Sequence, residues 1–400
     1  MAVFTTLRLG DPFGVPLAEI ATYGTPDASG GGGAALNVVY NCAPGAVGVL
    51  ETTLPLSFDP TLLLEDGRIG VWRAINGRAP YLDNGAIFLV RYLDIGPQSI
   101  FVRAFHVSSL LDRRIIAYAA GSDFCTKAAG PADDTIKTFV NENMLAGISG
   151  ANRDGVETYA DVSAYLTKQV NLSQGASIAI SASRRNLLDT CTNLAQSSAT
   201  AGVYLTFEVY APTEGTLELR TYATQRGVDR RVGNAGGLPP VILSRLRGNL
   251  TNDHLVTDFT QVKSFVVAGG QGEQTERLIG TAFDSVRAST SPFGRNEVFR
   301  DATNVSAQAA VDDESDSLLR AARPVIYVTG NLVETPALTR GIDYDLGDVL
   351  TVEHPQAKTQ IDVRLDIVHE IINVGGSQSG EPLTAHQVQP RRQLVGLRSV

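Results

Sequence analysis

The sequence has 400 residues, more than one hydrophobic core usually serves, so we expect about two to four domains. Hydrophobic residues make up 43% of the chain and charged residues 19%, proportions that are ordinary for a globular protein and argue against a disordered chain. The net charge is −9, and the basic clusters at residues 226–231 and 391–392 are short, so we do not expect sequence-specific binding of nucleic acid.

Membrane insertion and cysteine chemistry are also disfavoured. No apolar run approaches the length of a membrane span, and the first residues lack the regions of a secretion signal, so we expect a soluble protein without a membrane partner. Cys42, Cys125 and Cys191 are odd in number and far apart, unlike a disulfide framework or a metal site. We interpret them as buried or bystander thiols.

The first part of the chain is predicted to be β-structure. Short apolar runs alternate with Gly, Pro, Asn and Asp, a pattern typical of an antiparallel sandwich or barrel. A flexible glycine-rich loop is expected at residues 25–33. The predicted strands are residues 4–9, 17–22, 35–40, 48–55, 68–73, 86–92 and 99–107.

The middle of the chain is predicted to be α+β. Residues 131–144 begin with Pro and two Asp and place Ile136, Phe139, Val140 and Met144 on one face, which indicates a capped amphipathic helix. Residues 183–198 repeat this pattern behind Ser183 as a candidate cap. A hairpin is expected from residues 203–210 and 216–222.

We interpret residues 233–240 as a linker or a loop, after which the chain returns to β-structure. Strands are predicted at residues 261–268, 276–285, 325–332 and 383–389, and a helix at 305–323 that ends before Pro324. Residues 342–353, IDYDLGDVLTVE, and the alternating run 361–368, IDVRLDIV, read as a hairpin region. There Gly347 and Asp348 make the turn, and Val349, Leu350 and Val352 enter a sheet.

The predicted fold class is therefore α+β and mainly β. We expect three domains at residues 1–112, 113–245 and 246–400, of which the two β-rich ends resemble a distant duplication.

Sites for chemistry are sparse, and we assign no catalytic, cofactor-binding or metal-binding residue. No two histidines have metal-ligand spacing, no serine lies in a nucleophile elbow, and neither Gly30–Gly33 nor Gly269–Gly272 completes a phosphate-binding motif. Two acidic clusters would permit glycosidase chemistry but are more simply a helix N-terminus and a solvated surface. The histidines are His106, His254, His354, His369 and His386, and the clusters are Asp133–Asp134 and Asp312–Asp316.

One acidic stretch leaves an alternative open. Asp343, Asp345 and Asp348 could coordinate Ca²⁺ through their oxygens, but they lack the twelve-residue loop with its terminal Glu. We therefore favour a turn over an ion site.

Five ordered segments carry a resemblance. They are LLDRRIIAYAAGS (110–122), TIKTFVNENM (135–144), VVAGGQGEQTERLI (266–279), GRNEVFRDATNV (294–305) and DYDLGDVLTVE (343–353). Together they resemble the baseplate hub or tail-associated proteins of long-tailed bacteriophages, including hub-like siphophage tail proteins. The resemblance covers roughly residues 35–390, almost the whole chain; residues 1–34 match no part of it.

This resemblance implies an architecture rather than a reaction. Such hubs are similar to the hub part of type VI secretion spike proteins, in which two β-barrel-like domains from the chain ends flank a middle region. A homotrimer would then adapt the sixfold tail tube to a threefold tip at the end of the virion tail. The implied partners are the distal tail protein or tail tube, a spike, fibre or receptor-binding protein, and the tape measure protein.

The same resemblance implies a mechanical role without a cofactor. The hub would gate passage of the tape measure and DNA, and an acidic lumen would keep DNA from sticking to the wall. Because only a short stretch follows residue 353, we expect no separate enzymatic domain. Two alternatives remain: a distal tail or other hexameric baseplate ring protein, and a glycan-degrading enzyme on a β scaffold.

Overall fold

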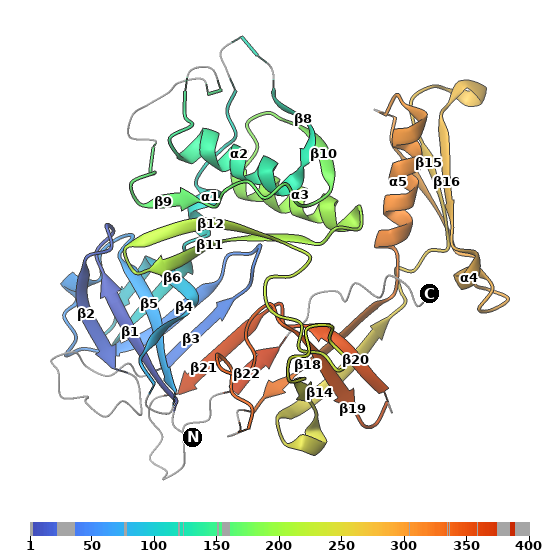
Figure 1. Ribbon diagram of the computed structural model, residues 1–400. Coiled ribbons are helices and arrows are strands. Elements are labelled where there is room, and N and C mark those ends of the chain that lie inside the picture. The colour runs from blue at the N-terminus through green and yellow to red at the C-terminus, as the bar shows by residue number, and fades with distance from the viewer. Residues whose placement is uncertain are drawn as a thin grey trace. The chain divides into compact units, whose positions relative to one another are not determined.

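A computed structural model describes most of the chain, and the strands it contains outnumber the helices (Figure 1). The glycine-rich loop predicted at 25–33 and the ends of the last predicted strand lie outside the described residues. The described residues are 3–21, 37–75, 78–118, 121–122, 124–149, 152–153, 161–303, 305–333, 335, 337–357, 359–373 and 385–388.

The described chain forms two compact units. The described residues of the first unit lie within Met1–Ser198, Tyr204–His254 and Val328–Arg391. The described residues of the second unit lie within Ala199–Val203 and Leu255–Tyr327. The second unit is thus a sequence insertion between two β-rich parts of the first.

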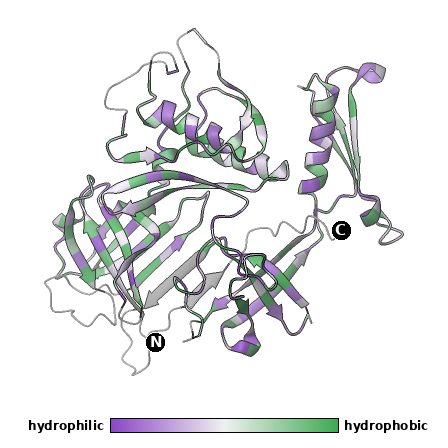
Figure 2. Cartoon of the chain, viewed as in Figure 1, coloured by the Kyte–Doolittle hydropathy of each residue, from purple (hydrophilic) through white to green (hydrophobic). Residues whose placement is uncertain are grey.

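The N-terminal β prediction is confirmed strand by strand. Hydrophobic and hydrophilic residues alternate along these strands (Figure 2), and in one of them Leu50, Thr52 and Leu54 are buried while the residues between them are half-buried. The strands are β1 (Val3–Gly10), β2 (Pro16–Ala21), β3 (Asn37–Cys42), β4 (Val49–Pro55), β5 (Arg68–Ile75), β6 (Tyr81–Ile95) and β7 (Ser99–His106), and β7 is followed by the short helix α1 (Ser109–Asp112).

Strand β6 begins five residues earlier than predicted. Asn84 and Gly85 have φ values of 51° and 60°, and the register with β5 shifts at this point, so the strand passes through a bulge. A Cβ atom on Gly85 would lie 2.3 Å from the ring of Tyr210, so glycine is required for space as well as for conformation. The Asp-Asn-Gly sequence, which is typical of turns, therefore lies inside a strand.

The N-terminal and C-terminal parts of the chain share one sheet. Strand β3 pairs antiparallel with β21 (Val368–Asn373), which places Val39 opposite Ile371. The sheet has eleven strands in the order β14-β18-β22-β21-β3-β4-β7-β6-β5-β1-β2. The prediction of a mainly β protein with α+β character is confirmed, whereas no closed barrel is found among the described strands.

The middle region covers a hairpin with two helices. The helices α2 (Ala132–Met144) and α3 (Leu187–Thr200) pack on the hairpin of β11 (Leu205–Thr213) and β12 (Thr216–Ala223), and one apolar core runs through all four (Figure 1). The predicted face of α2 is buried, with Phe139 and Val140 fully covered. The region also contains three strands that the sequence analysis missed: β8 (Cys125–Pro131), β9 (Leu166–Lys168) and β10 (Ser177–Ala182).

The predicted cap of the second helix is wrong. Helix α3 begins at Leu187, four residues after Ser183. The Asn186 side chain accepts a hydrogen bond from the Asp189 backbone N–H at 3.1 Å, so Asn186 is the capping residue. Asn186 also donates to the Asp112 carbonyl at 2.8 Å, which ties the helix start to α1.

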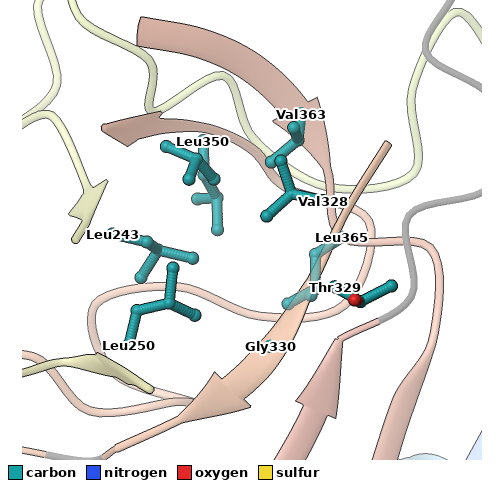
Figure 3. Close-up of a pocket in the computed structure, with 9 residues that line it drawn as sticks. Leu243, Leu250, Val328, Thr329, Gly330, Leu350, Val363 and Leu365 are labelled. Carbon is teal, nitrogen blue, oxygen red and sulfur yellow. The ribbon is translucent and has the colours of Figure 1, made fainter. Parts of the chain in front are cut away.

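The C-terminal part of the first unit places strands around an apolar interior (Figure 3). The side chains of Leu243, Leu250, Leu350 and Val363 point into it and leave a cavity of about 10 Å³, the size of one water molecule. The strands of this part are β13 (Ile242–Leu243), β19 (Val349–His354), β20 (Thr359–Arg364) and β22 (Ala385–Val388), together with the portions of β14 (Leu250–Asp258) and β18 (Val325–Leu332) that belong to the first unit.

The hairpin predicted around Gly347 and Asp348 has a different turn. Strand β19 pairs with β20 across the segment between His354 and Thr359, whereas Gly347 and Asp348 make the turn that precedes β19. The run predicted at 361–368 is also divided: β20 ends at Arg364, and Leu365 bonds to the Gly347–Asp348 turn through its N–H and C=O. The chain then joins the large sheet as β21.

The second unit has two layers. Helix α5 (Gln308–Ala321) packs on one face of a three-stranded sheet of β15 (Phe265–Gly269), β16 (Ile279–Phe283) and β17 (Glu297–Asp301), next to the short helix α4 (Ser285–Ala288). The close packing depends on Gly280, where a Cβ atom would lie 2.6 Å from the Val311 carbonyl oxygen. Within the described residues, no helix has both the length and the apolarity needed to cross a membrane.

Candidate functional site

The most unusual group of side chains in the first unit is a buried charge junction beside the IDYDLGD stretch. It consists of Arg340, Asp83, Tyr40, Asn84 and Asp345, which come from the N-terminal strands β3 and β6 and from the β18–β19 connection. The side chains of Arg340 and Asp83 are both 0% exposed. Burial of a charged pair is costly unless its hydrogen bonds are complete, so the geometry of this pair decides its effect.

The pair has bidentate geometry. Arg340 Nη1 donates to Asp83 Oδ1 at 2.9 Å, and Nη2 donates to Oδ2 at 3.1 Å. The Tyr40 hydroxyl donates to the same carboxylate at 2.6 Å. A fork of two parallel N–H···O bonds is the strongest arrangement of arginine with a carboxylate.

Asp345 and Asn84 complete the junction on its outer side. Asp345 Oδ1 lies 3.6 Å from Arg340 Nη1, and the Asn84 amide nitrogen, facing Asp345, donates to Oδ1 at 3.2 Å. Burial raises the pKa of Asp345, and the neighbouring Arg340 opposes this shift. The bulge in β6 therefore has a role: it turns Asn84 toward the β18–β19 connection.

A second buried pair joins the middle region to the same connection. Arg226 Nε donates to Glu208 at 2.9 Å, and Arg226 Nη1 donates to the Leu346 carbonyl at 2.7 Å. Burial lowers the pKa of Arg226, but the facing Glu208 more than offsets this and leaves it above its usual range. The Tyr222 hydroxyl donates to Glu208 at 2.7 Å, so this carboxylate serves two partners.

The Asp348 carboxylate accepts hydrogen bonds from two nearby backbone N–H groups. Its Oδ1 accepts from the Val228 N–H at 2.5 Å and its Oδ2 from the Asp345 N–H at 2.9 Å. A Cβ atom on Gly227 would lie 2.2 Å from Asp348 Oδ1, so this approach requires glycine. Burial raises the pKa of Asp348, and these backbone hydrogen bonds oppose the shift.

The carboxylates of Asp343, Asp345 and Asp348, the alternative Ca²⁺ ligands, do not converge on one point. Asp343 accepts from the Thr339 N–H at 2.7 Å, Asp345 faces Arg340, and Asp348 faces Val228. In the part of the chain that the structure describes, no group of three or more His, Cys, Asp or Glu side chains is arranged to hold a metal ion. The carboxylates act as caps of backbone amides and as ion-pair partners.

The acidic pair at the start of α2 binds neighbouring backbone and a lysine. Asp133 is buried and pairs with Lys137 at 3.0 Å while it accepts from the Gln174 N–H at 2.7 Å. Asp134 accepts from the Leu172 N–H at 3.0 Å. The pair at the start of α2 therefore fixes a neighbouring loop, in addition to the favourable helix-end position that was predicted.

The remaining sequence candidates lie apart from the junction or inside the core. Cys42, Cys125 and Cys191 are free and buried, and burial raises the pKa of the Cys191 thiol to about 12. His106 is buried, whereas His254 is exposed. Gly269 and Gly270 are buried inside the second unit, and Gly30–Gly33 and the side chains of His369 and His386 lie outside what the structure describes.

The charge junction could not be predicted from the sequence. Arg340 and Asp83 are 257 residues apart in the chain, and no local pattern reports such a pairing. The available signal was weak: Asp-Asn-Gly inside an apolar run indicates a bulge, and a bulge re-aims a side chain. Chemically, the junction fixes three chain segments in register, and the Arg340 and Asp83 side chains at its centre are fully buried.

Residues 96–382 match the family described as Siphovirus ReqiPepy6 Gp37-like protein. The match covers well over half of the chain. No curated protein matches the sequence.

Several solved structures share the fold at low identity. The 43 kDa tail protein of prophage MuSo2 from Shewanella oneidensis is 10% identical, with a TM-score of 0.58 over 97% of this chain and 98% of that chain. A tail protein from Neisseria meningitidis MC58 is 12% identical, with a TM-score of 0.57 and 97% of both chains covered. A chain of a PdpA–VgrG complex is 11% identical, with a TM-score of 0.51, and covers 98% of this chain and 65% of that chain.

Proposed function

This chain belongs to the Siphovirus ReqiPepy6 Gp37-like family and has the fold of phage tail proteins, and we propose that it is the hub of a bacteriophage tail tip or baseplate. Three copies form a homotrimer that adapts the sixfold tail tube to a threefold tip. The hub gates the passage of the tape measure protein and DNA. Its location in the virion is the tail tip.

One observation carries this proposal: two β-rich parts from opposite ends of the chain are joined in one sheet. The N-terminal part contributes β1–β7, and the C-terminal part contributes β14, β18, β21 and β22. Three copies of a chain with two such parts present six β-rich parts around an axis. A threefold assembly can thereby match a sixfold tube.

We propose that each β-rich part is a barrel-like domain in the assembled hub. The apolar interior lined by Leu243, Leu250 and Leu350, with strands on several sides, supports this for the C-terminal part (Figure 3). The proposed domains are residues 1–112, 113–245 and 246–400. The middle one holds α2 and α3.

The buried junction suits a mechanical role. It fastens the β18–β19 connection to β6 through Arg340 and Asp83. The second buried pair ties the same connection to the middle region through Arg226 and the Leu346 carbonyl. A bidentate pair that is fully buried resists displacement because separating it exposes two charges to a low dielectric. A hub that bears load between tube and tip requires such fixed angles between its parts.

The proposed partners are the distal tail protein or tail tube on one side and a spike, fibre or receptor-binding protein on the other. The tape measure protein is the proposed third partner, inside the channel. The net charge of −9 favours a channel wall that repels DNA. A reconstruction with a basic channel wall would contradict that part of the proposal.

We propose that the chain acts without catalysis. The groups at the junction are buried or bonded to backbone, which favours a structural role over an enzymatic one. Incubation of the purified chain with bacterial envelope material tests this, because release of glycan fragments would favour the glycan-degrading alternative. No release is the expected result.

The number of copies per particle separates the hub from its nearest alternative. Quantitative mass spectrometry of purified virions, with a tail-tube protein as internal standard, gives this number directly. We expect three copies per tail. Six copies would favour the distal tail or other hexameric ring protein.

A further inference from the structure

The first turn of α2 contains a lysine and an aspartate that are buried together. Lys137 Nζ lies 3.0 Å from Asp133 Oδ2, and the two side chains are 0% and 1% exposed. Residues four apart in a helix face each other, and lysine and aspartate are rarely buried so completely. Ile136 and Val140 of the same helix belong to the apolar core of the middle region, so the pair is kept from bulk water.

Burial changes the chemistry open to this pair. An ammonium and a carboxylate that touch without water can exchange one proton, which leaves a neutral amine and a carboxylic acid. A neutral amine is a nucleophile, whereas an ammonium ion is not. The two groups that form the ion pair are therefore also the reactants for an amide bond.

The neighbouring backbone supplies a hydrogen-bond donor to the carboxyl group. The Gln174 N–H donates to Asp133 Oδ1 at 2.7 Å, while Oδ2 faces the lysine. The two oxygens thus have different partners. A fixed N–H at Oδ1 stabilises the negative charge that develops on this oxygen when an amine attacks the carboxyl carbon.

Asp134 is positioned to move the protons. Its Oδ1 lies 3.8 Å from Lys137 Nζ, and its side chain is 17% exposed. The N–H groups of Leu172 and Ser173 donate to Oδ1 at 3.0 and 3.3 Å, and the Ser173 hydroxyl donates to Oδ2 at 3.2 Å, which fixes the carboxylate. The lysine side chain is the flexible member, so a small torsional change brings Nζ within hydrogen-bond distance of this base.

We propose that Lys137 and Asp133 condense to form an isopeptide bond. The Nζ atom transfers one proton to Asp133 Oδ2 and attacks Cγ, and negative charge develops on Oδ1 beside the Gln174 N–H. Asp134 takes a second proton from Nζ and passes it to Oδ2. The Cγ–Oδ2 bond then breaks, and one water molecule leaves. The ammonium and the carboxylate thereby become an amide and water, with no oxidation and no cofactor.

The bond closes a covalent ring over the first turn of α2. Strand β8 runs directly into this helix at Ala132, so tension along the chain reaches α2 at this turn (Figure 1). A ring there prevents the helix from unravelling at its first turn. The proposal does not depend on the hub assignment, because it rests on one pair inside the middle region.

A second lysine–carboxylate pair provides a matched control. Lys127 Nζ lies 2.7 Å from both oxygens of Glu142, closer than in the Lys137 pair, but these side chains are 23% and 16% exposed. Water stabilises the charged forms of both groups. We therefore expect Lys127 and Glu142 to remain an ion pair.

Mass spectrometry of the full chain tests the bond. The wild-type chain should be lighter than its sequence predicts by the mass of one water molecule. Trypsin cleaves after a free lysine but not after an acylated one, so residues 128–137 and 138–153 should remain one peptide. Lys137→Arg should restore the full mass, whereas Lys127→Arg should leave the deficit. Because mass is measured on denatured protein, these results do not depend on the stability of the variants.

Asp134→Asn tests the proton carrier. The substitution keeps the shape of the side chain and leaves both reactants in place, so we expect bond formation to slow by about a hundredfold or more. Samples taken at intervals after synthesis give the rate from the fraction of chains with the full mass. An unchanged rate would overturn the role of Asp134.

The outcomes distinguish the bond from other losses of water. A wild-type chain with the full sequence mass and normal cleavage after Lys137 would overturn the proposal. A deficit within residues 128–137 with normal cleavage after Lys137 would indicate a cyclic imide at an aspartate, which would overturn it as well. A peptide of residues 128–153 whose fragments locate the amide between Lys137 and Asp133 would support it.

Discussion

Arg340 and Asp83 form a buried ion pair whose importance follows from its isolation from water. A lone charge in such a place costs several kcal/mol, whereas the Asp83 carboxylate here accepts two hydrogen bonds from Arg340 and one from Tyr40. The pair therefore sets the relative position of β6 and the β18–β19 connection. Its removal should matter far more than removal of a surface pair.

Arg340→Met should lower the free energy of unfolding by about 3–5 kcal/mol, because it leaves the Asp83 carboxylate buried without its cation. Arg340→Met combined with Asp83→Asn should lose less than the single variant. Arg103→Met, which breaks an exposed pair with Glu51, is the control and should lose about 1 kcal/mol or less. Chemical denaturation measures all three; an Arg340→Met loss no larger than the control would contradict the buried-charge account.

Asp348→Lys should impair folding and assembly. The substitution removes the acceptor of the Val228 and Asp345 N–H groups and brings a cation toward Arg230. Hydrogen bonds to a charged group contribute about 1.5–3 kcal/mol each, so we expect a loss of at least about 3 kcal/mol. Asp94→Lys, at an exposed position, is the control; equal soluble yields of the two variants would show that the turn does not depend on Asp348.

His106 should make stability depend on pH. Burial lowers its pKa to about 4 from about 6.5, partly offset by Glu208, while Arg226 acts in the same direction as burial. The folded state keeps the imidazole neutral, whereas the unfolded state binds a proton below about pH 6.5. The free energy of unfolding therefore decreases as the pH falls from 6.5 toward 4, by about 3 kcal/mol in total.

Urea denaturation of wild type and His106→Gln at several pH values isolates this contribution from that of the carboxylates. The wild-type chain should lose more stability than the variant between pH 6.5 and pH 4. Parallel pH profiles would mean that His106 is not kept neutral by the fold.

At the scale of elements, the sequence predicts a strand or helix well wherever one side-chain period persists. The strand predicted at 325–332 and the buried face of α2 follow directly from hydrophobic periodicity. Three elements of the middle region, β8, β9 and β10, were missed, because β9 has only three residues and β8 and β10 expose much of their length. The division of residues 361–368 between two sheets depends on Leu365 bonding to a distant turn, which no local pattern reports.

The start of α3 allows a paired test of capping. Asn186→Ala removes the acceptor for the Asp189 N–H and the donor to the Asp112 carbonyl, so it should cost about 1–2 kcal/mol. Ser183→Ala, at the position favoured by sequence alone, should change the free energy of unfolding by no more than about 0.5 kcal/mol. Thermal or chemical denaturation measures both variants. A larger loss in the free energy of unfolding for Ser183→Ala than for Asn186→Ala would show that Ser183 is the cap.

At the scale of the molecule, β-structure at both ends of the chain could be predicted, but the joining of these ends in one sheet could not. Composition and turn spacing place β-structure at both ends, whereas pairing of Val39 with Ile371 in one sheet is a contact between residues far apart in sequence. The charge junction depends on the same long-range closure. The sequence contains both partners of that junction without any signal that joins them.

The central claim is that three copies of this chain present six β-rich parts around the tail axis. A cryo-EM reconstruction of the tail tip that contains the chain tests it most directly. We predict threefold symmetry with three copies and six β-rich parts in a ring below the tube. Six copies in a sixfold ring, or a position outside the tail tip, would contradict the account.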